Sequence, residues 1–102
     1  MRLREYQEQS KRTLNQNLDK KDQITNMIIG VMGESGEVAD IIKKSLYQGH
    51  DLDREKISEE IGDVMFYIVN LCNILEQDLE TIISNNYFKL LNRYPNGFEV
   101  AR

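Results

Sequence analysis

A single proline, Pro95, lies seven residues before the end of this 102-residue sequence. Because proline removes a backbone donor and clashes with the preceding helical turn, its absence from the first 94 residues permits long helices there. Apolar residues recur with the 3.6-residue period of a helix, and no segment alternates with the period of two that is typical of a strand. The sequence therefore predicts an all-α fold.

The apolar period and the capping residues place the helices. Helical segments are expected at 3–18, 22–47, 54–75 and 79–94. Asp53 and Asp78 are candidate N-caps, and Gly49 occupies the position that favours glycine after a helix. Since the connections at 48–53 and 76–78 are short, neighbouring helices are expected to run antiparallel. We therefore predict a compact four-helix arrangement.

Length and charge limit the class of protein. Residues 1–102 suit one small domain with a modest core, so oligomerisation is a natural supplement. The net charge of -4 argues against nucleic acid as a partner. One cysteine, Cys72, permits neither an intrachain disulfide nor a cysteine metal cluster. The polar N-terminus lacks the pattern of a signal peptide, and no apolar run approaches the roughly 20 residues of a membrane span, so we expect a cytoplasmic protein without a membrane partner.

Two acidic motifs, GESGE and EEIGD, interrupt the apolar faces of the second and third predicted helices. At about 100° per residue, Glu34 and Glu60 each fall near the edge of an apolar stripe. Glu37 and Asp63 each lie about 60° further out. The rise of about 1.5 Å per residue places both pairs at similar heights in an antiparallel hairpin. If the two stripes face each other, the four carboxylates converge.

Converging carboxylates repel one another and lose hydration, so they need a counterion. Ligands that are all oxygen suit Mg²⁺ or Mn²⁺. Gly33, Gly36 and Gly62 would leave room beside the carboxylates for a metal, a substrate or a close helix, each at a cost of about 1 kcal/mol relative to alanine. Either acidic pair alone would be typical of a solvated helix face. The match in angle, height and flanking glycine favours a metal site formed by Glu34, Glu37, Glu60 and Asp63.

Two other kinds of metal site fit the sequence less well. Di-iron four-helix proteins use Glu-x-x-His on two helices, whereas the only histidine here, His50, has no glutamate three residues before it. An EF-hand is disfavoured because the segment DLDREK lacks glycine at its sixth position.

Basic and amide side chains flank the last predicted helix. Asn86, Lys89 and Arg93 share one side of its apolar stripe, and Lys44 lies on the same face as Glu37, about two turns further on. Mg²⁺ with converging lysine and arginine is the combination that holds polyphosphates. Each of these cations, taken alone, would be an ordinary surface residue.

Three segments resemble the MazG-like, all-α nucleoside triphosphate pyrophosphohydrolases: GESGEVADIIKK, EEIGDVMFYI and NYFKLLNRYPNGF, in that order. The resemblance implies hydrolysis of a nucleoside triphosphate to the monophosphate and pyrophosphate. It implies that Glu34, Glu37, Glu60 and Asp63 ligate Mg²⁺. It also implies assembly as a homodimer or homotetramer, with sites near the subunit interface.

The resemblance extends to the residues around the reaction. Asn86, Lys89 and Arg93 match its C-terminal motif and would bind the substrate, as we expect also of Lys44. Glu34 or Glu37 would orient or deprotonate the attacking water. Phe66 stands where many relatives carry tryptophan, which bears on base contacts. Two readings without catalysis compete with this one: a nucleotide-binding sensor, and a helical interaction module whose acids are solvated.

Overall fold

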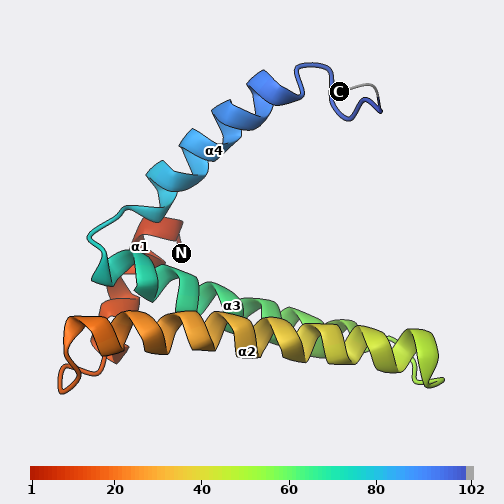
Figure 1. The fold of residues 1–102 in the computed structure, drawn as a ribbon, viewed down its shortest axis with the longest axis horizontal. Coiled ribbons are helices and arrows are strands. Elements are labelled where there is room, and N and C mark those ends of the chain that lie inside the picture. The colour runs from red at the N-terminus through yellow and green to blue at the C-terminus, as the bar shows by residue number, and fades with distance from the viewer. Residues whose placement is uncertain (101–102) are drawn as a thin grey trace.

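The computed structural model describes residues 1–100 and contains four α-helices (Figure 1). Their bounds are α1 Leu3–Ser10, α2 Lys20–Tyr47, α3 Arg54–Ile74 and α4 Leu79–Arg93, with a 3₁₀ turn, η1, at Lys11–Thr13. Residues 1–100 contain no β-strand. The prediction of an all-α, four-helix fold is confirmed, and α2 and α3 run antiparallel. No helix in this part of the chain is long and apolar enough to cross a membrane.

Two predicted N-caps start helices as expected. The Asp53 carboxylate accepts a hydrogen bond from the Lys56 amide at 3.0 Å, and that of Asp78 accepts one from the Thr81 amide at 3.2 Å. These bonds satisfy amide groups that have no partner inside a helix. In the same connection as Asp53, between α2 and α3, Gly49 has a φ of 74°, the left-handed conformation that glycine adopts without strain.

The first predicted helix, 3–18, is wrong in its second half. The backbone becomes extended at Leu14, with a ψ of 136°. Asn15 then accepts a hydrogen bond from the Asn17 amide at 3.0 Å, and such local side-chain bonds compete with helix formation. Asp19 caps the next helix, so that α2 begins two residues earlier than the predicted residue 22.

The packing of α2 against α3, which lie side by side, forms most of the tertiary structure (Figure 1). Gly30 of α2 faces the Tyr67 ring of α3, and a Cβ at this glycine would overlap that ring. By contrast, a Cβ at Gly33, Gly36 or Gly62 would meet nothing within 4 Å. The close approach of the two helices therefore depends on Gly30, whereas the glycines of the acidic motifs border open space.

We expect Gly30→Ala to lower the free energy of unfolding. Overpacking against Tyr67 costs about 1–3 kcal/mol, and the better helix propensity of alanine returns about 1 kcal/mol of it. Gly36→Ala is the matched control on the same helix, and it should stabilise by up to about 1 kcal/mol because no atom opposes its Cβ. Urea unfolding at one protein concentration measures both. Equal stability of the two variants would contradict the dependence on Gly30.

A buried polar network joins α1 to the end of α3 and the start of α4. The Gln7 side-chain amide donates to Asn73 Oδ1 at 3.1 Å and to the backbone oxygen of Gln77 at 2.7 Å, and its oxygen accepts from the Leu79 amide at 2.9 Å. Asn73 donates in turn to Asn70 at 3.0 Å, and Asn70 is fully buried. Both polar atoms of the Gln7 side chain thus hold the connection between α3 and α4 against α1.

An apolar cluster and an ion pair complete this junction. The buried side chains of the cluster are Val69, Cys72 and Leu79, and Leu3, Tyr6, Met65 and Ile68 pack around them. Arg4 of α1 pairs with Asp78 at 3.0 Å and with Glu80 at 2.7 Å. The first turn of α4 is therefore anchored to α1 by both apolar and charged contacts.

Beyond its first turn, α4 extends away from the hairpin, and α1 is its main packing partner (Figure 1). The Cα radius of gyration is 16.8 Å, against about 13 Å typical of a domain of this length. The predicted apolar stripe of α4 is buried only at Leu79. Exposed large apolar side chains on α4 are Ile82, Ile83, Tyr87, Phe88, Leu90 and Leu91. A helix that exposes so many apolar side chains is typical of an interaction surface.

Candidate metal centre

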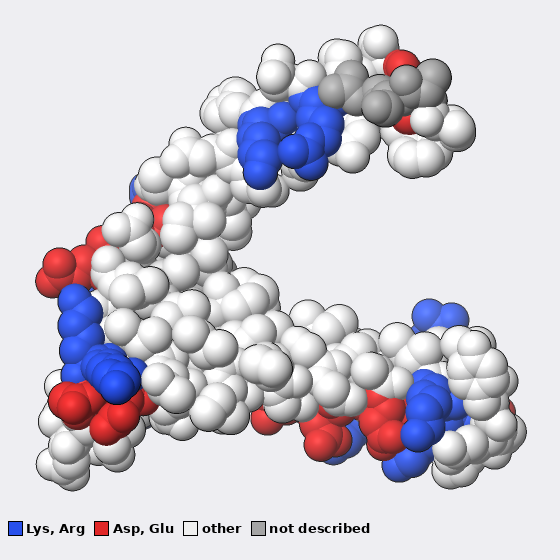
Figure 2. All heavy atoms as spheres, in the orientation of Figure 1, with Lys and Arg blue, Asp and Glu red and all other residues white. Residues whose placement is uncertain are grey.

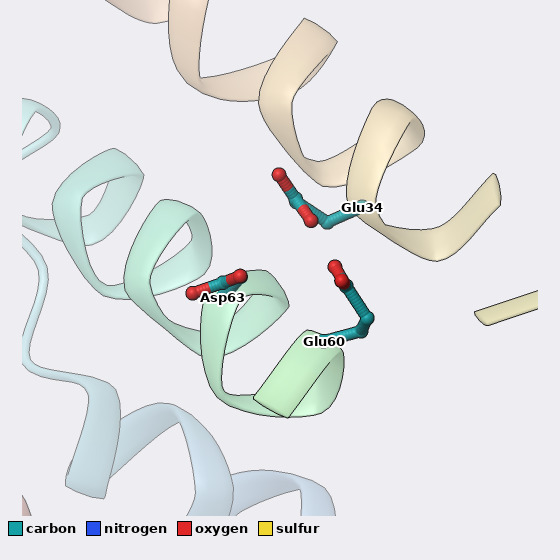
Figure 3. Close-up of side chains that lie close together, drawn as sticks. All are labelled: Glu34, Glu60 and Asp63. Carbon is teal, nitrogen blue, oxygen red and sulfur yellow. The ribbon is translucent and has the colours of Figure 1, made fainter. Parts of the chain in front are cut away.

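Three of the four predicted carboxylates come together between α2 and α3 (Figure 3). Glu34 projects from α2, and Glu60 and Asp63 project from adjacent turns of α3. One oxygen of each side chain lies within 4.8 Å of the others. Glu60 is buried, Glu34 half-buried and Asp63 exposed. Within residues 1–100 this is the one group of three or more such ligands that could hold a metal ion.

The electrostatics of the group follow from this crowding. A hydrogen bond with Glu60, partial burial, and the negative charges of Glu60, Asp63 and Glu37 raise the pKa of Glu34 to about 7. Below a pH of about 7 the carboxyl of Glu34 therefore holds a proton, which the hydrogen bond with Glu60 favours. A bound cation would remove the need for it.

The donor set fits a hard divalent cation. All three ligands are carboxylate oxygens, as Mg²⁺ and Mn²⁺ prefer. The three oxygens lie within 4.8 Å of one another, so the side chains would have to rotate toward one another to share one ion. With one ligand exposed, the group is open to solvent, which leaves coordination positions for water or for a substrate oxygen.

We expect the metal-free protein to lose stability as the pH rises from about 4.5 to about 7. The pKa of Glu34 is raised from 4.5 to about 7 in the folded chain, so in this window the folded state binds more protons than the unfolded state. Stability is then greatest at the acidic end and falls as the proton is lost. Melting temperatures in a metal chelator, at constant ionic strength, measure the effect.

Glu34→Gln is the control for this titration, because it removes the titrating group at nearly constant shape. Its melting temperature should fall less steeply than that of the parent across the same window. Asp40 and Asp78 have lowered pKa values, through Lys44 and Arg4 respectively, so their contributions change below the window. Parallel pH profiles of parent and variant would contradict the raised pKa of Glu34.

The fourth predicted ligand, Glu37, lies outside this group of oxygens. It is exposed, one turn after Glu34 on α2, and its charge still acts on Glu34. The structure therefore brings oxygens of Glu34, Glu60 and Asp63 together and leaves Glu37 beside this group. Lys56, which was not predicted, forms an ion pair with Glu60 at 3.5 Å. Its spacing of four residues from Glu60 is the sequence signal that could have revealed it.

The predicted substrate-binding residues are not gathered around the carboxylates. Lys44 pairs with Asp40 on its own helix at 2.9 Å. Asn86, Lys89 and Arg93 are exposed on α4. In Figure 2 the basic side chains of α4 lie on the upper arm of the molecule, whereas the acidic side chains of the hairpin seen in this view lie along its lower edge, away from α4. Within one chain, these residues and the carboxylates remain apart.

The helical hairpin and its carboxylates define a class of all-α protein with a candidate divalent-metal centre between two long helices. Comparison with known families agrees, since the MazG nucleotide pyrophosphohydrolase domain matches residues 22–98. The chain belongs to this family. The matched region includes the three carboxylates and all of α4.

A protein of known sequence is similar to most of the chain. The Gene 37 protein of Mycobacterium phage L5 is 32% identical over 83 residues, which are 78% of this chain and 73% of the phage protein. Its name states no activity. No solved structure matches the chain significantly.

Proposed function

We propose that the protein hydrolyses nucleoside triphosphates to nucleoside monophosphate and pyrophosphate, with Mg²⁺ or Mn²⁺ as cofactor. The observation that carries the proposal is the meeting of Glu34, Glu60 and Asp63 oxygens inside a MazG domain. A cytoplasmic location, where such nucleotides are available, is part of the proposal.

Each carboxylate has a role in this proposal. Glu34, Glu60 and Asp63 would hold the cation, and Glu34 would give up its proton on binding it. When bound, the cation would supply positive charge to the phosphates and lower the pKa of a water. Glu37, which lies outside the group but one turn from Glu34, keeps a free carboxylate and accepts a proton from the attacking water.

The proposed reaction balances without a further reactant. The water oxygen bonds to one of the two phosphorus atoms that flank the α–β bridging oxygen, and the bond from that phosphorus to the bridging oxygen breaks. One water is consumed for each monophosphate and pyrophosphate released. Lys89 and Arg93 would balance the phosphate charge, and Asn86 would donate a hydrogen bond.

We propose further that the active form is a homodimer or homotetramer. Large apolar side chains of α4 and α2 are exposed in the single chain, among them Phe88 at 65% and Met32 at 68%. Burying them against a second chain would be favourable, and a second chain could also bring basic residues of α4 to the carboxylates. A monomeric mass by light scattering at tens of micromolar would contradict this part of the proposal.

The experiment that tests the activity is a pyrophosphate-release assay over a panel of ribo- and deoxyribonucleoside triphosphates. Each nucleotide is assayed with Mg²⁺, with Mn²⁺ and with a chelator, and orthophosphate is measured in parallel. We expect pyrophosphate, not orthophosphate, and only with a divalent cation. Nucleotide binding without release would instead support a sensor, and neither binding nor release would support the reading of the acids as a solvated face.

A further inference from the structure

The side chain of Lys56 is the cation nearest to the carboxylate group that the structure describes. Its Nζ lies 3.5 Å from Glu60 Oε1. The two side chains differ in environment, because that of Glu60 is 10% exposed and that of Lys56 is 52% exposed. Glu60 is therefore largely covered among the other acids, while about half of the lysine side chain is open to solvent.

The four-residue spacing brings Lys56 beside Glu60, but the first turn of a helix is an unfavourable place for a lysine. Asp53 caps α3, and its carboxylate accepts a hydrogen bond from the Lys56 amide. The lysine therefore lies in the first turn of the helix. A cation there opposes the helix macrodipole. In addition, a lysine four residues before a glutamate is the less favourable orientation of such a pair. Local helix energetics thus disfavour a lysine at this position, and the contact with Glu60 offsets that cost.

The carboxylate group does need a cation at this position. Oxygens of Glu34 and Asp63 lie within 4.8 Å of one of the buried Glu60, so a charge on Glu60 is both desolvated and repelled. Lys44, another lysine of the hairpin, is paired with Asp40. Among the ion pairs that the structure describes, Lys56 alone joins the group to a positive charge.

We propose that Lys56 is a displaceable internal counterion of the metal centre. It neutralises Glu60 while the centre is empty, and it leaves Glu60 when a divalent cation binds there. The consequence is a raised threshold for metal, since each ion must displace the ammonium group and overcome its repulsion. This proposal rests on the proposed function, because it takes the three carboxylates as metal ligands.

The test measures binding of metal alone, without nucleotide. Mn²⁺ is titrated into the full chain and the free ion is followed by electron paramagnetic resonance, with Mg²⁺ as competitor. Lys56→Gln removes the charge at similar length, and Lys56→Arg keeps it. Lys21→Gln is the matched control, because Lys21 is also an exposed lysine in the first turn of a long helix but lies far along α2 from Glu34.

We expect Lys56→Gln to bind Mn²⁺ roughly three- to tenfold more tightly than the parent, since an ion pair with a largely buried acid is worth more than an exposed pair. Lys56→Arg and Lys21→Gln should stay within about twofold of the parent, because each leaves a charge beside Glu60. Without metal, Lys56→Gln should melt about 2–5 °C below Lys21→Gln, because Glu60 loses its counterion.

The outcomes separate this proposal from the proposed function. If the parent binds metal and Lys56→Gln binds it equally or less tightly, Lys56 is not a displaced counterion, although the metal centre stands. Equal metal-free melting temperatures of Lys56→Gln and Lys21→Gln would also overturn the counterion. If the parent binds neither Mn²⁺ nor Mg²⁺ at millimolar concentration, the metal centre itself fails and the counterion proposal falls with it.

Discussion

Glu60→Gln is expected to abolish metal-dependent pyrophosphate release while the fold remains intact. Glu60 is the buried member of the carboxylate group, and glutamine keeps its shape but removes the charge that a cation needs. Loss of several kcal/mol of metal-derived stabilisation lowers kcat/KM by roughly 10²–10³-fold or more. The measurement is pyrophosphate release at saturating Mg²⁺, run beside thermal melting with and without the ion.

Melting temperatures with and without Mg²⁺ test whether Glu60 is a metal ligand. Without metal, Glu60→Gln removes the repulsion from two close acids together with one ion pair to the half-exposed Lys56. Because we expect the repulsion to be the larger of the two, its melting temperature should equal or exceed that of the parent. Added Mg²⁺ should stabilise the parent by mass action and the variant much less. Glu59→Gln is the control, since this neighbouring acid is exposed and lies outside the oxygen group. An active Glu60→Gln variant, or equal Mg²⁺ shifts in all three proteins, would refute the assigned centre.

The helices were predictable because their signals are local. Asp53 and Asp78 cap helices where the sequence placed them, and the 3.6-residue period identified the long segments. The error at 3–18 has a local cause as well. The hydrogen bond from the Asn17 amide to the Asn15 side chain stabilises a turn in place of the helix. The spacing of apolar residues up to Leu14 gives no indication of this turn.

What covers each apolar stripe could not be predicted, since the helical period shows that a face is apolar but does not identify its partner. Tyr87 and Leu90 recur with the helical period on α4, yet they are exposed in the single chain. Conversely, Gln7 and Asn70 are polar and yet buried. Both form hydrogen bonds with Asn73 at the junction of α1 and α3. The burial of such polar residues cannot be predicted from the apolar period of the sequence.

The candidate centre was predictable to the level of helix faces. Rotation about the helix axis brought Glu34 and Glu60 to facing edges, and the structure places their oxygens together with that of Asp63. Rotation alone could not separate Glu37 from the other three, because about 60° of angle still allows a flexible side chain to reach inward. Side-chain positions were needed to show that Glu37 stays outside the group.

The basic residues of α4 lead to a prediction about assembly. In one chain, Lys89 and Arg93 stand on a helix that extends away from the carboxylates (Figure 2). Replacing both with alanine should lower kcat/KM by roughly 10²–10⁴-fold, since hydrogen bonds to phosphate from charged donors are worth about 1.5–3 kcal/mol each. The fold should be unaffected, because both side chains are exposed. Pyrophosphate-release kinetics and melting temperatures check the two statements.

Mixed oligomers then show whether α4 serves its own chain or a partner. Glu60→Gln and the Lys89→Ala/Arg93→Ala double variant are each expected to be inactive or nearly so. The two are co-expressed with different tags and the mixed oligomer is purified through both. If α4 of one chain completes the centre of the other, one arrangement in the mixed dimer combines an intact carboxylate group with an intact α4.

Activity should therefore return in the mixed oligomer although both components lack it. Half of the sites in a mixed dimer become intact, so its specific activity should approach about half that of the parent. If each chain instead bends α4 back onto its own hairpin, every site of the mixed dimer carries one defect and no activity returns. A parent–Glu60→Gln mixed dimer, which keeps one intact site in either arrangement, controls for damage caused by co-expression. Activity in this control without activity in the mixed variant would assign α4 to its own chain and overturn the shared site.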